Sequence, residues 1–286
     1  MGLILSIQSH VAYGYVGNRA ATFPLQVMGH EVIQINTVQF SNHTGYGAWT
    51  GEIFSKDHIQ DLLKGIRDRG LFPQISAVLS GYLGASALGD VILDTVAELK
   101  SQNKDLLYCC DPVMGDVGRG FFVSEGIPPF FRDHALQKAD IITPNLFELE
   151  TLSGEAIKTL EDARRACQKL YEDGPKMILV TSVQTAQTPT GMIEMLLSIK
   201  DGQAFLIQTP ELVMDIAPNG SGDMTAAVFL GFIQQGNTPQ EALGHTAAAI
   251  FKVFEQTQKD QRRELALVKA QDAFREKDTR FAITKL

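Results

Sequence analysis

A glycine-rich turn near residue 220 combines a backbone suited to anions with a carboxylate. It reads Gly220-Ser221-Gly222-Asp223 and precedes an Ala-rich segment that predicts a buried helix. Free N–H groups at the start of a helix bind anions, and the helix dipole assists them. Asp223 could merely complement that dipole. It could also accept the proton of a substrate hydroxyl while the turn holds a transferring phosphoryl group.

Two other carboxylates follow predicted strands. Asp111 comes directly after the apolar run Leu106–Cys110, where it could act on Mg²⁺ or its waters near phosphates, or could cap a turn. The glycine-rich run that follows Asp111 could form a flexible lid. Glu148 stands three residues after Asn145, which is the spacing of a helix capping box. This spacing predicts a structural role for Glu148 and does not by itself assign the residue to a metal.

Three loops bring polar and aromatic side chains to the ends of predicted strands. Ser9 follows the first strand, as a helix cap or a ligand contact, in a loop that lacks the dinucleotide pattern G-x-G-x-x-G. The segment Phe40–Trp49 carries two glycines and several aromatic residues, and it could cover a small aromatic ligand or form a surface turn. Tyr82 adds a ring after the third strand. The missing glycine pattern disfavours a dinucleotide site.

Short apolar runs alternate with amphipathic segments, which predicts an α/β fold. Most runs lack polar alternation, as expected of strands buried on both faces of a parallel sheet. Helical spacing appears within 59–66 and 88–99. We therefore expect a doubly wound, mostly parallel sheet flanked by helices, with ligands at the carboxyl ends of the strands. The runs are Leu3–Ile7, Val32–Val38, Ile75–Leu79, Leu106–Cys110, Ile141–Thr143, Met177–Val180, Met192–Ile199 and Ala204–Ile207.

The second half of the chain adds three expectations. The last two runs are too close for an intervening helix, and they predict an antiparallel hairpin at an edge of the sheet. Thr238-Pro-Gln-Glu241 has capping-box spacing and predicts a helix through about Phe254. The charged stretch Gln256–Lys285 predicts a solvated outer helix without chemistry of its own. Since no linker or repeat divides residues 1–286, we expect a single domain.

Composition excludes several classes of function. The chain has 286 residues, with 25 Lys and Arg against 33 Asp and Glu, a net charge of −8 and a pI of about 5.3. This balance, without a basic cluster, argues against nucleic acids and anionic membranes as partners. The three cysteines form no metal or redox motif, and no apolar run reaches the roughly 18 residues of a membrane span. We expect a cytoplasmic protein.

The motifs taken together resemble those of the pyridoxal kinases in the ribokinase-like superfamily, nearest the bacterial PdxY-type branch. The resemblance extends over essentially the whole chain. Its most specific parts are the two N-terminal blocks, Ser9–Asn18 and Asn36–Gly47, because the later motifs are shared across the superfamily. Those later motifs are Leu79-Ser-Gly-Tyr-Leu-Gly84, Cys110-Asp-Pro-Val-Met-Gly115, Thr143-Pro-Asn-Leu-Phe-Glu148 and Gly220-Ser-Gly-Asp223.

This resemblance implies ATP-dependent phosphorylation of the 5′-hydroxyl of pyridoxal to pyridoxal 5′-phosphate, in a vitamin B6 salvage route. It implies that Asp223 is the general base and that Gly220, Ser221 and Gly222 form the anion hole. It also implies an Mg²⁺ ion that Asp111 and Glu148 hold through water, an optional monovalent cation and a homodimer. The residues implied for pyridoxal are Ser9, Thr44, Gly45, Tyr82 and Asp223. Those implied for ATP are Asp111, Thr143, Glu148, Thr181 and Ser182.

One position departs from the pattern, and other functions stay open. Position 181 is Thr where some relatives have Lys, which leaves more of the phosphate charge to Mg²⁺. A kinase for hydroxymethylpyrimidine or another small alcohol would share the later motifs but lack the two N-terminal blocks. A non-catalytic carrier of pyridoxal or its phosphate would keep the pocket without turnover. An NAD-binding protein is disfavoured because the glycine fingerprint is missing.

Overall fold

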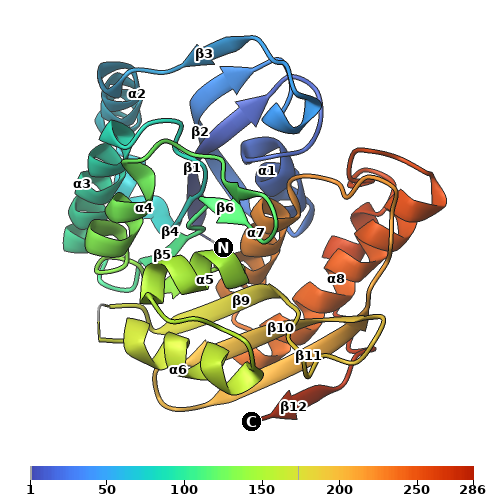
Figure 1. Cartoon of the computed structure of the whole chain (residues 1–286). Helices are drawn as coiled ribbons and strands as arrows, with labels where there is room; N and C mark the ends of the chain where they lie inside the picture. Colours follow the sequence, from blue (N-terminus) through green and yellow to red (C-terminus); the bar gives the residue numbers. More distant parts are fainter. Residues whose placement is uncertain (1, 173) are drawn as a thin grey trace.

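A central ten-stranded sheet organises the protein (Figure 1). The computed structural model describes residues 2–172 and 174–286. The strand order is β12-β11-β10-β9-β8-β5-β4-β1-β2-β3, and β6 pairs with β7 in a separate hairpin. The strands are β1 (Leu3–Val11), β2 (Glu31–Phe40), β3 (Gly51–Ile53), β4 (Ile75–Ser80), β5 (Leu107–Cys110), β6 (Gly115–Asp116), β7 (Gly120–Phe121), β8 (Ile141–Ile142), β9 (Met177–Val183), β10 (Met192–Ile199), β11 (Ala204–Pro210) and β12 (Ile283–Lys285).

The centre of the sheet is parallel and both edges are antiparallel. Strands β2, β1, β4, β5, β8 and β9 pair in parallel. The predicted hairpin is confirmed, because β10 and β11 pair in antiparallel fashion around the turn at 200–203. Beyond the hairpin, the short strand β12 extends the sheet by one more antiparallel pairing. Strand β3 is antiparallel to β2 at the other edge. The mostly parallel α/β fold expected from the sequence is therefore confirmed.

Helices cover both faces of the sheet and enclose two apolar cores (Figure 1). Helices α1, α7 and α8 pack on one face with Leu25, Phe229 and Leu243 fully buried. Helices α2 to α6 pack on the other face, around Leu63, Val96 and Leu149. The helices are α1 (Asn18–Val27), α2 (Lys56–Asp68), α3 (Ala87–Gln102), α4 (Ile127–Phe130), α5 (Leu146–Ser153), α6 (Leu160–Leu170), α7 (Ser221–Gln234) and α8 (Pro239–Lys259). No helix in these described ranges is both long and apolar enough to span a membrane.

The last part of the chain differs from the prediction. The capping box of Thr238 and Glu241 begins α8 as expected, but the helix continues past Phe254 to Lys259. The predicted outer helix over Gln256–Lys285 is wrong. After α8 the chain is irregular, forms a 3₁₀ turn at Gln271–Phe274 against α1 and α8, and ends in β12. Leu265 and Phe274 are fully buried, so these two residues complete a core and do not line one face of a solvated helix, whereas Val268 is exposed.

The order of the strands predicts a crevice next to β1. The chain passes from β1 to β2 on one side and then returns to β4 on the other side of β1. Loops that follow strands on the two sides of such a reversal diverge, and they leave room for a ligand at the carboxyl ends of the strands. Ser9 near the end of β1 and Tyr82 after β4 stand at this reversal.

Candidate active site

The glycine turn before α7 is shaped by close backbone packing. Gly220 has a φ of +88°, and a Cβ at this position would lie 1.7 Å from the carbonyl oxygen of Tyr15. Only glycine fits both the left-handed conformation and this approach. No side chain of the described residues caps the helix at Gly220, so the first N–H groups of α7 are left to bind a ligand. A helix start of this kind suits an anion, and the anion hole at Gly220–Gly222 stays a prediction.

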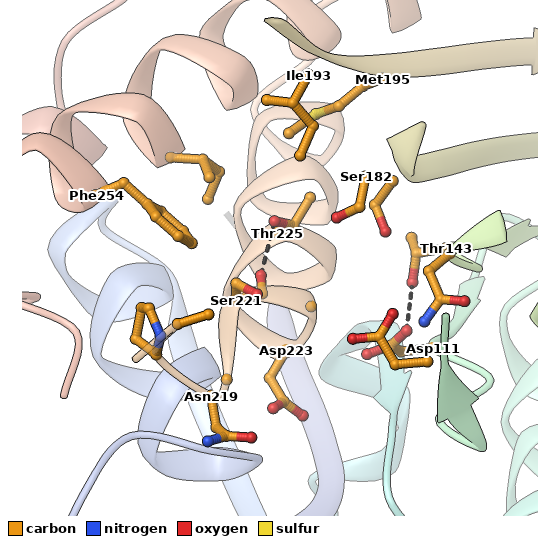
Figure 2. A pocket seen from close by; sticks show the side chains of 18 of the residues that line it. Asp111, Thr143, Ser182, Ile193, Met195, Asn219, Ser221, Asp223, Thr225 and Phe254 are labelled. Carbon is orange, nitrogen blue, oxygen red and sulfur yellow. Dashed lines mark hydrogen bonds between the residues drawn. The ribbon is translucent and has the colours of Figure 1, made fainter. Parts of the chain in front are cut away.

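Asp223 stands in the first turn of α7, and its carboxylate lies in the cavity beside Asn219 (Figure 2). Burial raises the pKa of this carboxyl, while the backbone at Gly17 and at Asp223 itself lowers it by less. A carboxylate with a raised pKa is a stronger base than a fully solvated one. Its position next to the glycine turn fits its predicted role, the removal of a proton from a hydroxyl that attacks a phosphoryl group.

Asp111 follows β5, where its backbone N–H donates to the carbonyl of Ser80 (2.9 Å). The side chain is buried. Oδ1 accepts a hydrogen bond from the Thr143 hydroxyl (3.0 Å), whereas Oδ2 has no partner in the described part of the chain. Burial raises the pKa of Asp111 well above its ordinary value, and the charges of Glu148 and Asp223 raise it further. A cation near Oδ2 would stabilise the carboxylate.

Glu148 has the structural role that its spacing predicts. It forms a capping box with Asn145 at the start of α5, in which Oε2 accepts from the Asn145 N–H (3.0 Å). Oε1 also accepts from the Met114 N–H (2.8 Å) and so ties α5 to the segment after β5. Burial raises the pKa of Glu148 to about 8, although backbone donors at Asn145, Met114 and Gly115 oppose the shift.

The carboxylates of Asp111 and Glu148 suit a metal ion whose remaining ligands are phosphates and water. Within residues 2–172 and 174–286, no group of three or more His, Cys, Asp or Glu side chains could hold a metal ion. Mg²⁺ commonly takes one or two carboxylates and completes its shell with phosphates and water. The unpartnered Oδ2 of Asp111 is the observation that fits such an ion. The metal roles of Asp111 and Glu148 stay predictions.

One cavity of about 430 Å³ unites most of the predicted site residues. Figure 2 shows the carboxylates of Asp111 and Asp223 within the same space, between the start of α7 and the strand ends. The predicted residues that line the cavity are Thr44, Asp111, Thr143, Glu148, Thr181, Ser182, Gly220, Ser221, Gly222 and Asp223. Sequence motifs more than 170 residues apart therefore meet at the carboxyl ends of the strands. The individual roles of these residues stay predictions.

One wall of the cavity is apolar and was not anticipated from the sequence. Figure 2 shows Ile193 and Met195 of β10 opposite Phe254 of α8. Thr181 and Ser182 border this wall at the end of β9, and Ser182 holds a left-handed φ of +51°. An apolar wall beside the glycine turn suits a flat heteroaromatic base. Sequence patterns miss such residues because apolar side chains on strands and helices are indistinguishable in sequence from residues of the hydrophobic core.

The remaining predicted residues do not line this cavity. Ser9 is buried against Gly17, whose backbone in turn contacts Asp223. Gly45 faces the side-chain amide of Asn219, next to the glycine turn. These contacts bring both residues close to the Gly220–Asp223 turn from the side of β1 and β2.

Tyr82 lies after β4 and belongs to a small apolar cluster. Burial raises the pKa of its hydroxyl. Tyr82 packs against the cluster of Val11, Val38 and Phe40, on β1 and β2. Tyr82 is thus held near the reversal in strand order, and its contact with a substrate stays a prediction.

The β6–β7 hairpin supplies the one basic side chain among the described lining residues. Arg119 Nη1 donates to Asn219 Oδ1 (3.4 Å), and its guanidinium lies 5.9 Å from the ring centroid of Phe122. The hairpin therefore reaches the glycine turn. The glycine-rich sequence predicts a lid here but did not single out Arg119. The acidic residues that line the same cavity are Asp111, Asp116, Glu148, Glu194, Glu211 and Asp223.

Two residues after α8 also belong to the surroundings of the site and were missed. Glu264 accepts hydrogen bonds from the backbone N–H of Tyr15 (3.0 Å) and from the hydroxyl of Tyr46 (2.7 Å). Arg263 donates to the carbonyl of Gly45 (2.6 Å). The wrong assignment of this segment to a solvated helix hid the contacts, and no local motif around 263–264 signals them.

Comparisons with known proteins identify the family of the chain. Residues 27–263 match the family model described as phosphomethylpyrimidine kinase. The chain is 49% identical over 275 residues to the pyridoxal kinase PdxY of Granulibacter bethesdensis, covering 95% of each chain. It is 48% identical to the PdxY of Rubrobacter xylanophilus, covering 99% of this chain and 97% of the relative.

Solved structures give the same result. The pyridoxal kinase of Leishmania donovani in complex with ADP and pyridoxamine superposes with a TM-score of 0.92 at 30% identity, over 100% of both chains. The pyridoxal kinase of Entamoeba histolytica superposes with a TM-score of 0.92 at 26% identity, also over 100% of both chains. This chain belongs to the phosphomethylpyrimidine kinase family and, within it, to the PdxY-type pyridoxal kinases.

Proposed function

We propose that this protein transfers the γ-phosphoryl group of ATP to the 5′-hydroxyl of pyridoxal and so forms pyridoxal 5′-phosphate. The observation that carries the proposal is the Gly220–Asp223 turn, which faces the carboxylate of Asp111 across one cavity. The turn offers backbone donors for phosphate and a base for the hydroxyl. Phosphoryl transfer depends mainly on positioning and charge neutralisation, which this arrangement can provide.

The residues divide between two substrates. We assign the γ-phosphate to the N–H groups of Gly220, Ser221 and Gly222, and the proton of the 5′-hydroxyl to Asp223. On the nucleotide side, Thr143, Thr181 and Ser182 border the phosphates, and the apolar wall of β10 and α8 receives the adenine. Mg²⁺ near Asp111 and Glu148 would neutralise phosphate charge when bound. On the other side we assign Ser9, Thr44, Gly45 and Tyr82 to the pyridoxal ring.

Arg119 takes part of the role that a basic residue at position 181 would have. Thr181 cannot neutralise a phosphate, and Arg119 is the basic side chain that the described cavity lining supplies. Its contact with Asn219 places it within reach of an anion at the glycine turn. Arg side chains bind phosphates through several N–H donors, which suits a hairpin that closes over ATP.

We further propose that residues 1–286 act as one kinase domain, that the protein is a cytoplasmic homodimer, and that a monovalent cation can assist ATP binding. The net charge of −8 supports the absence of nucleic acid partners. The single sheet through which both halves of the chain contribute to the cavity supports the undivided domain. Sedimentation analysis of the purified protein tests the dimer directly.

The test of function compares two acceptors. Purified protein is incubated with ATP and MgCl₂ and either pyridoxal or hydroxymethylpyrimidine, and the phosphorylated products are measured. Pyridoxal-selective turnover supports the proposal. Turnover with the pyrimidine alone would instead identify a hydroxymethylpyrimidine kinase of the same superfamily. Pyridoxal binding without any turnover would identify a carrier.

A further inference from the structure

The carboxylate of Glu264 is enclosed by loops from the opposite end of the chain. Its side chain is only 5% exposed. Oε2 accepts from the Tyr15 backbone N–H (3.0 Å), while Oε1 accepts from the Tyr46 hydroxyl (2.7 Å) and lies 3.0 Å from His43 Nε2. The partners are 218 to 249 residues away in sequence. A buried carboxylate with this many donors fixes all of them, because each would otherwise lose a charge-assisted hydrogen bond.

Arg263 holds the same turn from a second side. Its guanidinium lies 3.7 Å from the centroid of the Tyr46 ring, and its Nη2 donates to the Gly45 carbonyl (2.6 Å). The 3₁₀ turn Thr44–Tyr46 is thus held by two consecutive residues of the C-terminal segment. This turn carries Thr44, which lines the cavity, and Gly45, which faces Asn219.

The bond to Tyr15 extends the network to the glycine turn. Tyr15 presents its carbonyl to Gly220 at the close approach described above, and Gly14 packs directly on the Glu264 carboxylate. Glu264 is therefore joined to both segments that border the Gly220–Asp223 turn on the side of β1 and β2. A shift of either segment would change the space beside Asp223 without displacing the apolar nucleotide wall.

We propose that Glu264 is a positioning residue of the kinase. It sets the distance between the Thr44–Tyr46 turn and the Gly220–Asp223 turn, and so controls binding of the phosphate acceptor more than binding of ATP. This inference rests on the proposed function, since it assigns the Thr44 turn to pyridoxal. Glu264 itself is not assigned a contact with either substrate.

The central test is Glu264→Gln with Asp140→Asn as a matched control. Asp140 is also a nearly buried carboxylate, 8% exposed, that accepts a backbone N–H from Tyr108 (3.0 Å) and pairs with Lys100 and Lys176. It precedes β8 and therefore stands at the amino end of the strands, away from the cavity. Thermal unfolding is measured beside separate KM values for pyridoxal and ATP, and kcat.

We expect both variants to lose thermal stability and only Glu264→Gln to lose acceptor binding. The Gln side chain places an NH₂ donor against groups that already donate hydrogen bonds. The KM of Glu264→Gln for pyridoxal should therefore rise about tenfold or more. Its KM for ATP should stay within about twofold of the wild type. An unchanged KM for pyridoxal in folded Glu264→Gln would overturn the proposal, as would equal rises in both KM values.

Tyr46→Phe keeps the test decisive if Glu264→Gln does not fold. It removes a single hydroxyl donor and leaves the carboxylate in place, so we expect a smaller rise in the same KM. An unchanged KM for pyridoxal in Tyr46→Phe would then overturn the proposal. Failure of the proposed function is distinguishable, because in that case the wild-type protein itself does not phosphorylate pyridoxal.

Discussion

Replacing Gly220 by Ala gives a sharp test of the anion site, because α7 offers its own control. Gly220 precedes the helix with a φ of +88°, and Gly236 follows it with a φ of +82°. A Cβ at Gly220 would lie 1.7 Å from the Tyr15 carbonyl oxygen, whereas nothing lies within 4 Å of a Cβ at Gly236. Both substitutions cost roughly 1–2 kcal/mol of unfolding free energy for the left-handed conformation. Only Gly220→Ala adds a steric clash.

The clash sets the expected loss of activity. A Cβ contact below 3.0 Å is essentially never found, so the Gly220 turn must move by more than about 1 Å relative to Tyr15. A displacement of that size in a positioned group costs about 100-fold in rate, which corresponds to roughly 2.7 kcal/mol of transition-state stabilisation. We therefore expect kcat/KM for pyridoxal to fall about 100-fold in Gly220→Ala and to stay near the wild-type value in Gly236→Ala.

The assay is pyridoxal 5′-phosphate formation at saturating ATP, with thermal unfolding and circular dichroism of both variants. Gly236→Ala measures the cost of the left-handed backbone alone. If folded Gly220→Ala retained turnover within about threefold of Gly236→Ala, the Gly220–Gly222 turn would not hold the transferring group, and the assignment of the anion hole would be wrong.

Three further outcomes follow from the site and its charges. Asp223→Asn should lower kcat about 10²–10⁴-fold, as expected for loss of a general base. Because burial raises the pKa of Asp223, its ionised carboxylate destabilises the folded protein at neutral pH, so the melting temperature of Asp223→Asn should stay the same or rise. A lower melting temperature would contradict the placement of Asp223. Arg119→Met should raise the KM for ATP and leave the KM for pyridoxal nearly unchanged; steady-state kinetics with each substrate varied in turn would expose the opposite pattern. Burial raises the pKa of Asp140, but Lys100, the Tyr108 backbone and Lys176 outweigh this effect and hold the pKa below its ordinary value. The ionised Asp140 should therefore stabilise the folded protein fully above about pH 4, and this stabilisation should be lost as pH falls through the lower folded-state pKa. In denaturant unfolding, the stability of Asp140→Asn should approach that of the wild type only in that acidic range.

Local sequence patterns predicted the helices and strands well where the spacing of the residues matched either a strand or a helix. The apolar runs became the strands of a mostly parallel sheet, and the capping boxes at Asn145 and Thr238 begin α5 and α8 as expected. The C-terminal segment failed because its few apolar residues fall near helical spacing while they are buried by tertiary contacts. Leu265 and Phe274 fill a core without forming a helix.

The site was predictable where it rests on short polar motifs and not where it rests on packing. Asp111, Glu148 and Asp223 stand out by type and by position after strands or at a helix start. The apolar wall of Ile193, Met195 and Phe254 carries no such signal. Glu264 carries none either, because its partners come from the other end of the chain.

The imbalance of charge in the cavity has a consequence for how fast nucleotides arrive. Even without Asp111, Glu148 and Asp223, whose pKa values are raised by burial, the three acidic side chains of Asp116, Glu194 and Glu211 outnumber the single guanidinium of Arg119 among the described lining residues. The negative charge of this cavity repels a metal-free nucleoside triphosphate that diffuses toward it. The same nucleotide with a bound divalent ion carries less negative charge and is repelled less. Added salt screens repulsion over roughly 8–10 Å at physiological ionic strength. Association of metal-free ATP should therefore accelerate with salt, the reverse of the usual electrostatic steering.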